Sequence, residues 1–142
     1  MDCEKIIVCD NDQVSMGLVI DALNRELPNY EFIKGCQYPE QILKIIEKEK
    51  EKVLGVITEM SFFKDGESIK EGNLFNDKYL EIYKKIVEKE IPIMVYSHLG
   101  DLEQFKKQEE LVEADGNKWL IKCQVSITEL IPECQGFFKL SK

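Results

Sequence analysis

Residues 5–13 read "KIIVCDNDQ", where four apolar residues lead directly into Asp10, Asn11 and Asp12. A short apolar run of this kind predicts a buried β-strand over residues 5–9. Burying a carboxylate at the end of a strand is energetically costly unless it is paired. Asp10 is therefore expected to belong to a polar site, as a nucleophile, as a metal ligand or as the remnant of such a group. Asp12 is placed to cap a helix that begins at residue 13.

Alternation of two patterns along the chain predicts the fold class. Five short apolar runs alternate with longer stretches of helical periodicity, and this order is typical of an α/β domain with a parallel sheet and helices on both faces. In the first helix Leu18, Val19, Ala22 and Leu23 recur at helical spacing as candidate core residues. The predicted strands cover residues 5–9, 30–34, 53–58, 92–96 and 118–121. The predicted helices cover about residues 13–27, 39–50, 76–89, 101–113 and 126–133.

Length and composition limit the classes of function. At 142 residues we expect one domain, residues 1–142, without a separate output domain. The net charge of −8 argues against nucleic acid and favours a basic or amphipathic protein partner. No apolar run approaches the roughly 20 residues of a membrane helix and the first residues do not resemble a secretory signal, so we expect a cytoplasmic protein. The five cysteines include no C-x-x-C pair, and Cys9 and Cys123 are expected to be buried, inert thiols.

Polar residues follow four of the predicted strands. Ligands of open parallel sheets bind outside the carboxyl ends of the strands, where these residues would converge. Oxygen ligands suit a divalent cation, and a hydroxyl with an ammonium suits phosphate oxygens. The residues at these strand ends are Asp10-Asn11-Asp12, Thr58-Glu59, Ser97 and Lys122.

Four stretches together resemble the receiver domain of two-component response regulators. They are "KIIVCDND", "GVITEMSFF", "IPIMVYSHLGD" and "KWLIKC", in the order of that family's strand motifs. The resemblance implies a flavodoxin-like sheet of five parallel strands in the order 2-1-3-4-5, flanked by five helices. It places Glu59 at the phospho-acceptor position, and Asp10 and Asn11 on the acidic pair with Asp12 after it. Ser97, Trp119 and Lys122 fall on the switch and phosphate-contact positions.

Departures from the receiver pattern imply a degenerate domain. Glu59 replaces the family's shorter aspartate, and the neutral Asn11 leaves Asp10 as the only acid of the pair. The resemblance therefore implies no cofactor, or weakly bound Mg²⁺ at Asp10, Asn11 and Glu59. Cys123 stands where the family has proline, and the connection over residues 61–75 is longer than a receiver's.

A contact between Glu59 and Lys122 is expected, either as a plain structural ion pair or as an imitation of the phosphorylated state. In the second case the domain would signal through protein–protein contact without being phosphorylated. The partner would be a histidine kinase, a phosphotransfer protein, an output protein or a second copy of the chain. The family resemblance places the docking face around the fourth helix, fifth strand and fifth helix.

A second interpretation makes the chain a Mg²⁺-dependent phosphatase. "IIVCDNDQV" also matches the first motif of haloacid-dehalogenase-like enzymes, with Asp10 as nucleophile and Asp12 as general acid and base. Ser97 and Lys122 would then be the second and third motifs. That chemistry needs a further acidic cluster after the lysine, where this chain has two glutamates within a predicted helix and no aspartate. The receiver-like interpretation is therefore preferred.

Overall fold

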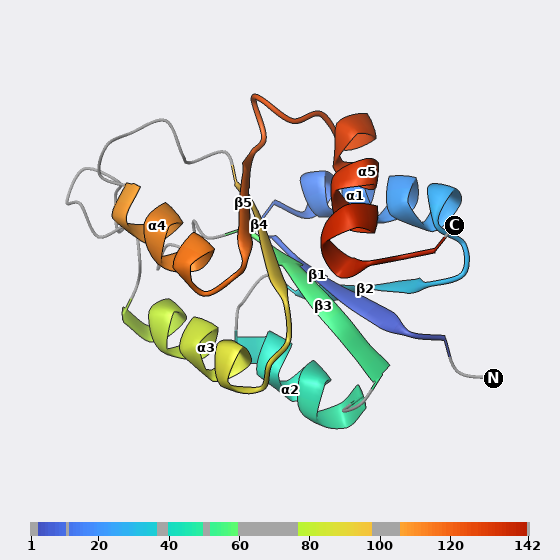
Figure 1. Cartoon of the computed structure of the whole chain (residues 1–142). Helices are drawn as coiled ribbons and strands as arrows, with labels where there is room; N and C mark the ends of the chain where they lie inside the picture. Colours follow the sequence, from blue (N-terminus) through green and yellow to red (C-terminus); the bar gives the residue numbers. More distant parts are fainter. Residues whose placement is uncertain are drawn as a thin grey trace.

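Strands and helices alternate along the described part of the chain (Figure 1). The computed structural model describes residues 3–10, 12–36, 40–49, 52–59, 77–97 and 106–141. The strands are β1 (Lys5–Cys9), β2 (Glu31–Cys36), β3 (Val53–Thr58), β4 (Ile93–Ser97) and β5 (Lys118–Ile121). The helices are α1 (Gln13–Glu26), α2 (Glu40–Glu49), α3 (Asp77–Glu88), α4 (Lys106–Ala114) and α5 (Ile127–Phe138).

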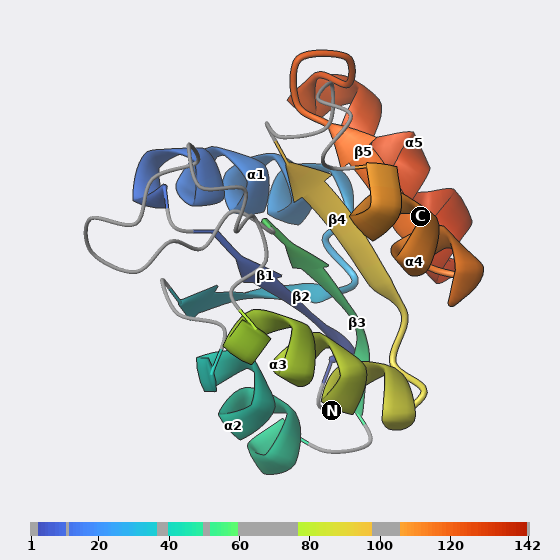
Figure 2. The same cartoon turned by 90° about the vertical axis from the view of Figure 1, so that its left-hand side faces the viewer.

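All five strands form one parallel sheet in the order β2-β1-β3-β4-β5. Helices α1 and α5 cover one face of the sheet, and α2, α3 and α4 cover the other (Figures 1 and 2). This architecture confirms the predicted fold class and strand order. No described helix has the length and apolar character required to cross a membrane.

The interior strand β1 is buried on both sides, which explains its continuous apolar run. Ile6 and Val8 pack in the core with α1 and α5, whereas Ile7 and Cys9 pack in the core with α2, α3 and α4. Side chains alternate across a strand, so a strand between two helical layers needs apolar residues at every position. Because β1 lies between β2 and β3, the chain that leaves it enters the interior of the sheet's carboxyl edge.

Helix α5 lies close against the middle of the sheet through an aromatic contact. A Cβ added at Gly55 of β3 would lie only 2.1 Å from a ring carbon of Phe138. Glycine at this position therefore lets the Phe138 ring rest directly on the strand. Leu130, Cys134 and Phe138 recur every four residues and are all buried, so the apolar face of α5 continues to the end of the helix.

Several predictions about individual residues and boundaries were wrong. Leu18 is 54% exposed, because α1 turns Met16, Val19 and Leu23 toward the sheet. Cys123 is exposed in the turn after β5, so only Cys9 of the two thiols is buried. Helix α5 extends to Phe138 rather than ending near residue 133, with Pro132 inside it. β2 continues to Cys36 rather than ending at residue 34. Residues 61–75 and 101–105 lie outside the described residues.

Candidate functional site

Four strand ends bring polar residues together at the carboxyl edge of the sheet. Asp10 follows β1, Glu59 follows β3, Ser97 ends β4 and Lys122 follows β5. The backbone ladder continues past the strands, because the Glu59 amide donates to the Cys9 carbonyl at 2.9 Å and the Lys122 amide donates to the Ser97 carbonyl at 2.8 Å. The site residues are thus held in register by main-chain hydrogen bonds.

The ammonium of Lys122 lies between two carboxylates. Its Nζ is 2.6 Å from Oδ2 of Asp10 and 3.3 Å from Oε2 of Glu59. It also donates to Oγ of Ser15 in α1 at 3.2 Å. The Lys122 side chain is 18% exposed, while those of Asp10 and Glu59 are 7% and 0% exposed. A group this poorly hydrated depends on its partners for its charge to be tolerated.

The remaining carboxylate oxygens of Asp10 and Glu59 are also engaged. Oε1 of Glu59 accepts a hydrogen bond from the Ser97 hydroxyl, and both residues are fully enclosed. Oδ1 of Asp10 accepts from the Asp12 amide at 2.8 Å. Each of the four carboxylate oxygens therefore has a partner. We call Asp10, Glu59, Ser97 and Lys122 the strand-end network.

Electrostatics at the strand-end network favour a charged lysine. Burial by itself would lower the pKa of Lys122, but its hydrogen bond to Asp10 and the negative charges of Glu59 and Asp10 raise that pKa overall. Nζ also lies 5.6 Å from the centre of the Tyr96 ring, within reach of a cation–π attraction. Burial raises the pKa of Tyr96, whose hydroxyl donates to the Val125 carbonyl at 2.7 Å. Lys122 is thus a cation with acids on one side and an aromatic ring nearby.

Asp12 caps helix α1, as its position in the sequence predicts. Its Oδ1 accepts hydrogen bonds from the amides of Val14 and Ser15 at 3.0 and 3.2 Å. Those are the free amides of the first helical turn, which a side-chain oxygen at this position satisfies. The carboxylate that the phosphatase interpretation requires as a general acid is therefore used in helix capping.

The other predicted site residues differ in how they relate to the network. Trp119 is buried in the core beneath α2, α3 and α4. The Thr58 hydroxyl donates to the Glu59 carbonyl at 3.0 Å, so Glu59 rather than Thr58 supplies the side chain that meets Lys122. Asn11 lies outside the described residues. Sequence reasoning missed Ser15, whose hydroxyl meets Lys122 across 107 positions of sequence.

The described residues do not form a metal centre as they stand. No group of three His, Cys, Asp or Glu side chains among the described residues is arranged to hold a metal ion. Mg²⁺ requires oxygen ligands in near-octahedral geometry. The two carboxylates that would provide them already surround the Lys122 ammonium, so a divalent cation would have to displace it.

Solved structures with this fold include response regulator receiver domains. A receiver domain protein from Clostridium thermocellum is 18% identical with a TM-score of 0.63, over 95% of this chain and 94% of that chain. One from Methanospirillum hungatei JF-1 is 15% identical with a TM-score of 0.69, over 97% and 95%. A two-component response regulator from Clostridium difficile is 15% identical with a TM-score of 0.65, over 95% of both chains.

The chain therefore has the fold of a response regulator receiver domain over nearly its whole length. No protein-family model matches the sequence, and no curated protein sequence matches it either. These comparisons do not favour the phosphatase alternative, whose family is absent from the similar structures named above.

Proposed function

We propose that this chain is a receiver-like signalling domain that works through protein–protein contact and does not depend on phosphorylation. The observation that carries the proposal is the geometry of Glu59. One of its carboxylate oxygens accepts from the Ser97 hydroxyl, and the other pairs with Lys122 at 3.3 Å. In the receiver pattern, a hydroxyl and an ammonium at these positions contact the oxygens of a phosphoryl group. Here the carboxylate of a glutamate makes both contacts.

Glu59 is also poorly suited to accept a phosphoryl group. A carboxylate nucleophile must approach the phosphorus with a free oxygen, yet Glu59 is 1% exposed and both oxygens are engaged. Attack would require loss of the Ser97 hydrogen bond or the Lys122 ion pair. The charge-assisted contacts also lower the nucleophilicity of the carboxylate, because they stabilise its negative charge.

We further propose that Mg²⁺ binds weakly or not at all. Phosphoryl transfer of this type needs a metal to neutralise the charge of the donor. The sequence replaces one acid of the pair by Asn11, and Lys122 lies 2.6 Å from the remaining Asp10. A lysine ammonium in this place supplies the positive charge that a metal would otherwise bring. Two carboxylates and one ammonium leave the network with a net charge of about −1.

Phosphorylation is tested with a small phosphodonor. The purified protein is incubated with acetyl phosphate and Mg²⁺, and the intact mass is measured beside an active receiver domain as positive control. We expect no phosphoryl adduct on the wild-type protein. The Glu59→Gln variant provides the background, because its amide cannot form an acyl phosphate. An adduct present in the wild type and lost in Glu59→Gln would overturn phosphorylation independence.

We propose that the partner docks on the face formed by α4, β5 and α5. Support comes from the link between this face and the network, since Lys122 follows β5 directly and the Tyr96 hydroxyl bonds to Val125 in the turn before α5. Either another protein or a second copy of the chain would fit this role. Sedimentation velocity across a concentration series separates the two, because only self-association makes the sedimentation coefficient rise with concentration.

A further inference from the structure

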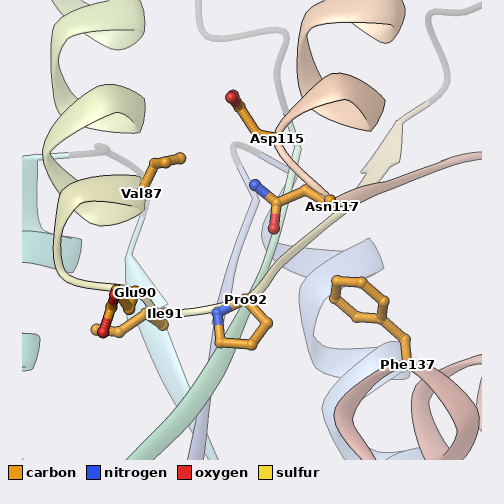
Figure 3. A pocket seen from close by; sticks show the side chains of 8 residues that line it. Val87, Glu90, Ile91, Pro92, Asp115, Asn117 and Phe137 are labelled. Carbon is orange, nitrogen blue, oxygen red and sulfur yellow. The ribbon is translucent and has the colours of Figure 1, made fainter.

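A cavity opens at the amino edge of the sheet, opposite the strand-end network. It has a volume of about 350 Å³ and lies between the end of α3, the turn from α4 into β5, and α5 (Figure 3). Both linking segments precede their strands, β4 and β5, which places the cavity at the far end of the sheet from Lys122. Its size is at the lower end of the roughly 300–1,000 Å³ typical of ligand pockets. The residues lining it are Val87, Glu90, Ile91, Pro92, Asp115, Gly116, Asn117 and Phe137.

Hydrogen bonds hold one wall of this cavity in place. Asn117 accepts from the Ile93 amide at 2.9 Å and donates to the Tyr83 hydroxyl at 3.1 Å. The Tyr83 hydroxyl in turn donates to Oδ2 of Asp115 at 2.8 Å. These bonds join α3, β4 and the turn after α4, so the wall does not need to form when a ligand arrives. A preformed pocket avoids part of the entropic cost of binding.

The lining combines apolar surface with negative charge. Val87, Ile91 and Phe137 are half-buried, which leaves apolar surface open to the cavity, with Pro92 between them (Figure 3). Glu90 and Asp115 are exposed acids on the rim.

Helix ends at the cavity add to this negative charge. Helix α3 ends at Glu88 and α4 ends at Ala114, so the carbonyl ends of both helices also face this edge. Helix C-termini carry partial negative charge and favour cations.

We propose that this cavity binds an arginine side chain presented by a partner protein. The alkyl part of arginine would cover the apolar lining, while its guanidinium would lie by Glu90 and Asp115. Arginine is favoured over lysine because its planar group stacks on an aromatic ring such as Phe137. The net charge of −8 adds long-range attraction for a basic partner. The inference does not rest on phosphorylation independence, since the two sites lie at opposite edges of the sheet.

The test is an NMR titration of the ¹⁵N-labelled protein with two blocked tripeptides. One is acetyl-Gly-Arg-Gly-amide, and the other carries citrulline, which has the shape of arginine without its charge. We expect saturable shifts at the amides lining the cavity with the arginine peptide, and a dissociation constant on the order of 1 mM for a ligand of this size. The citrulline peptide should bind at least about tenfold more weakly, because a charge-assisted contact is lost.

Two exposed glutamates provide matched variants for the same titration. Glu90→Gln should raise the dissociation constant roughly two- to fivefold, the range of an exposed ion pair. Glu47→Gln on α2 makes the same charge change away from the cavity and should leave binding unchanged. Phe137→Leu removes the ring on which the guanidinium would stack, so this variant should bind the arginine tripeptide no more tightly than the corresponding lysine tripeptide. The unfolding midpoint of the variant checks that it is folded. Any of three results would overturn the proposal. These are equal shifts with the citrulline peptide, equal effects of the two glutamate variants, and shifts that do not saturate at the cavity.

Discussion

Replacement of Lys122 by methionine tests whether the strand-end network depends on one cation. Methionine keeps most of the apolar stem of lysine but leaves Asp10 and Glu59 without their shared positive partner, at 2.6 and 3.3 Å in the wild type. Removing one partner of a buried ion pair costs about 3–5 kcal/mol. Because Lys122 is 18% exposed, water solvates part of the site, and we expect a loss near the lower end, about 3 kcal/mol.

Urea unfolding at pH 7 measures this loss by far-UV circular dichroism and by the fluorescence of Trp119, the single tryptophan. A deficit of that size lowers the urea midpoint by roughly 1–3 M, given typical urea slopes of about 1–3 kcal/mol per M. Lys118→Met, four residues earlier at the start of β5, is the matched control. The ion pair between Lys118 and Glu133 is 40% and 36% exposed, so its loss should cost less than about 1 kcal/mol.

Neutralising the network provides the decisive comparison. In the triple variant Asp10→Asn, Glu59→Gln, Lys122→Met no uncompensated charge remains, so much of the lost stability should return. A Lys122→Met variant as stable as Lys118→Met, or a triple variant no more stable than Lys122→Met, would contradict this explanation.

Three further predictions follow from packing and burial. Gly55→Ala should destabilise the protein by roughly 1–3 kcal/mol in urea unfolding, because the added methyl group meets the ring of Phe138. Gly17→Ala is the control, since a methyl group there has nothing within 4 Å, and it should be neutral or slightly stabilising. The pKa of Lys122 is raised in the folded protein, so its stabilising effect is complete below the ordinary lysine pKa of 10.5 and is lost as the pH rises through the folded value. The free energy of unfolding of the wild type should therefore fall above pH 10.5, and that of Lys122→Met should change less. Burial raises the pKa of Cys134 to about 12, so a disulfide reagent at pH 8 should modify the exposed Cys123 in seconds to minutes and Cys134 only on unfolding, as mass spectrometry of peptides would report.

The receiver-like proposal gives the strand-end network a role that differs from simple stability. A structural ion pair would lose stability on substitution without any effect on partner binding. If Glu59 imitates a phosphorylated acceptor, Glu59→Gln should also change the binding of the partner or the self-association of the chain. Measuring both properties on the same variant separates the two interpretations that the sequence left open.

Much of the fold follows from local sequence patterns. The apolar runs predicted β1, β3 and β5 with the bounds that the structure has, because a strand covered on both faces needs consecutive apolar residues. The Asp12 cap was also predictable, since capping involves amides only two and three residues away. The positions of the polar residues at the strand ends follow from the same runs, because a parallel sheet gathers the carboxyl ends of its strands at one edge.

Contacts between residues far apart in the sequence were decided only by the tertiary structure. Lys122 meets Asp10 across 112 positions and Ser15 across 107, and no local pattern indicates which of several acids an ammonium will contact. The rotation of α1 against the sheet exposed Leu18, although its spacing equally allowed burial. The ring of Phe138 at the end of α5 packs on the sheet where Gly55, 83 positions earlier, leaves room for it. Sequence therefore determined which residues reach each edge of the sheet, while packing determined which of them touch, because helix rotation and interlayer distance depend on side chains from the whole chain.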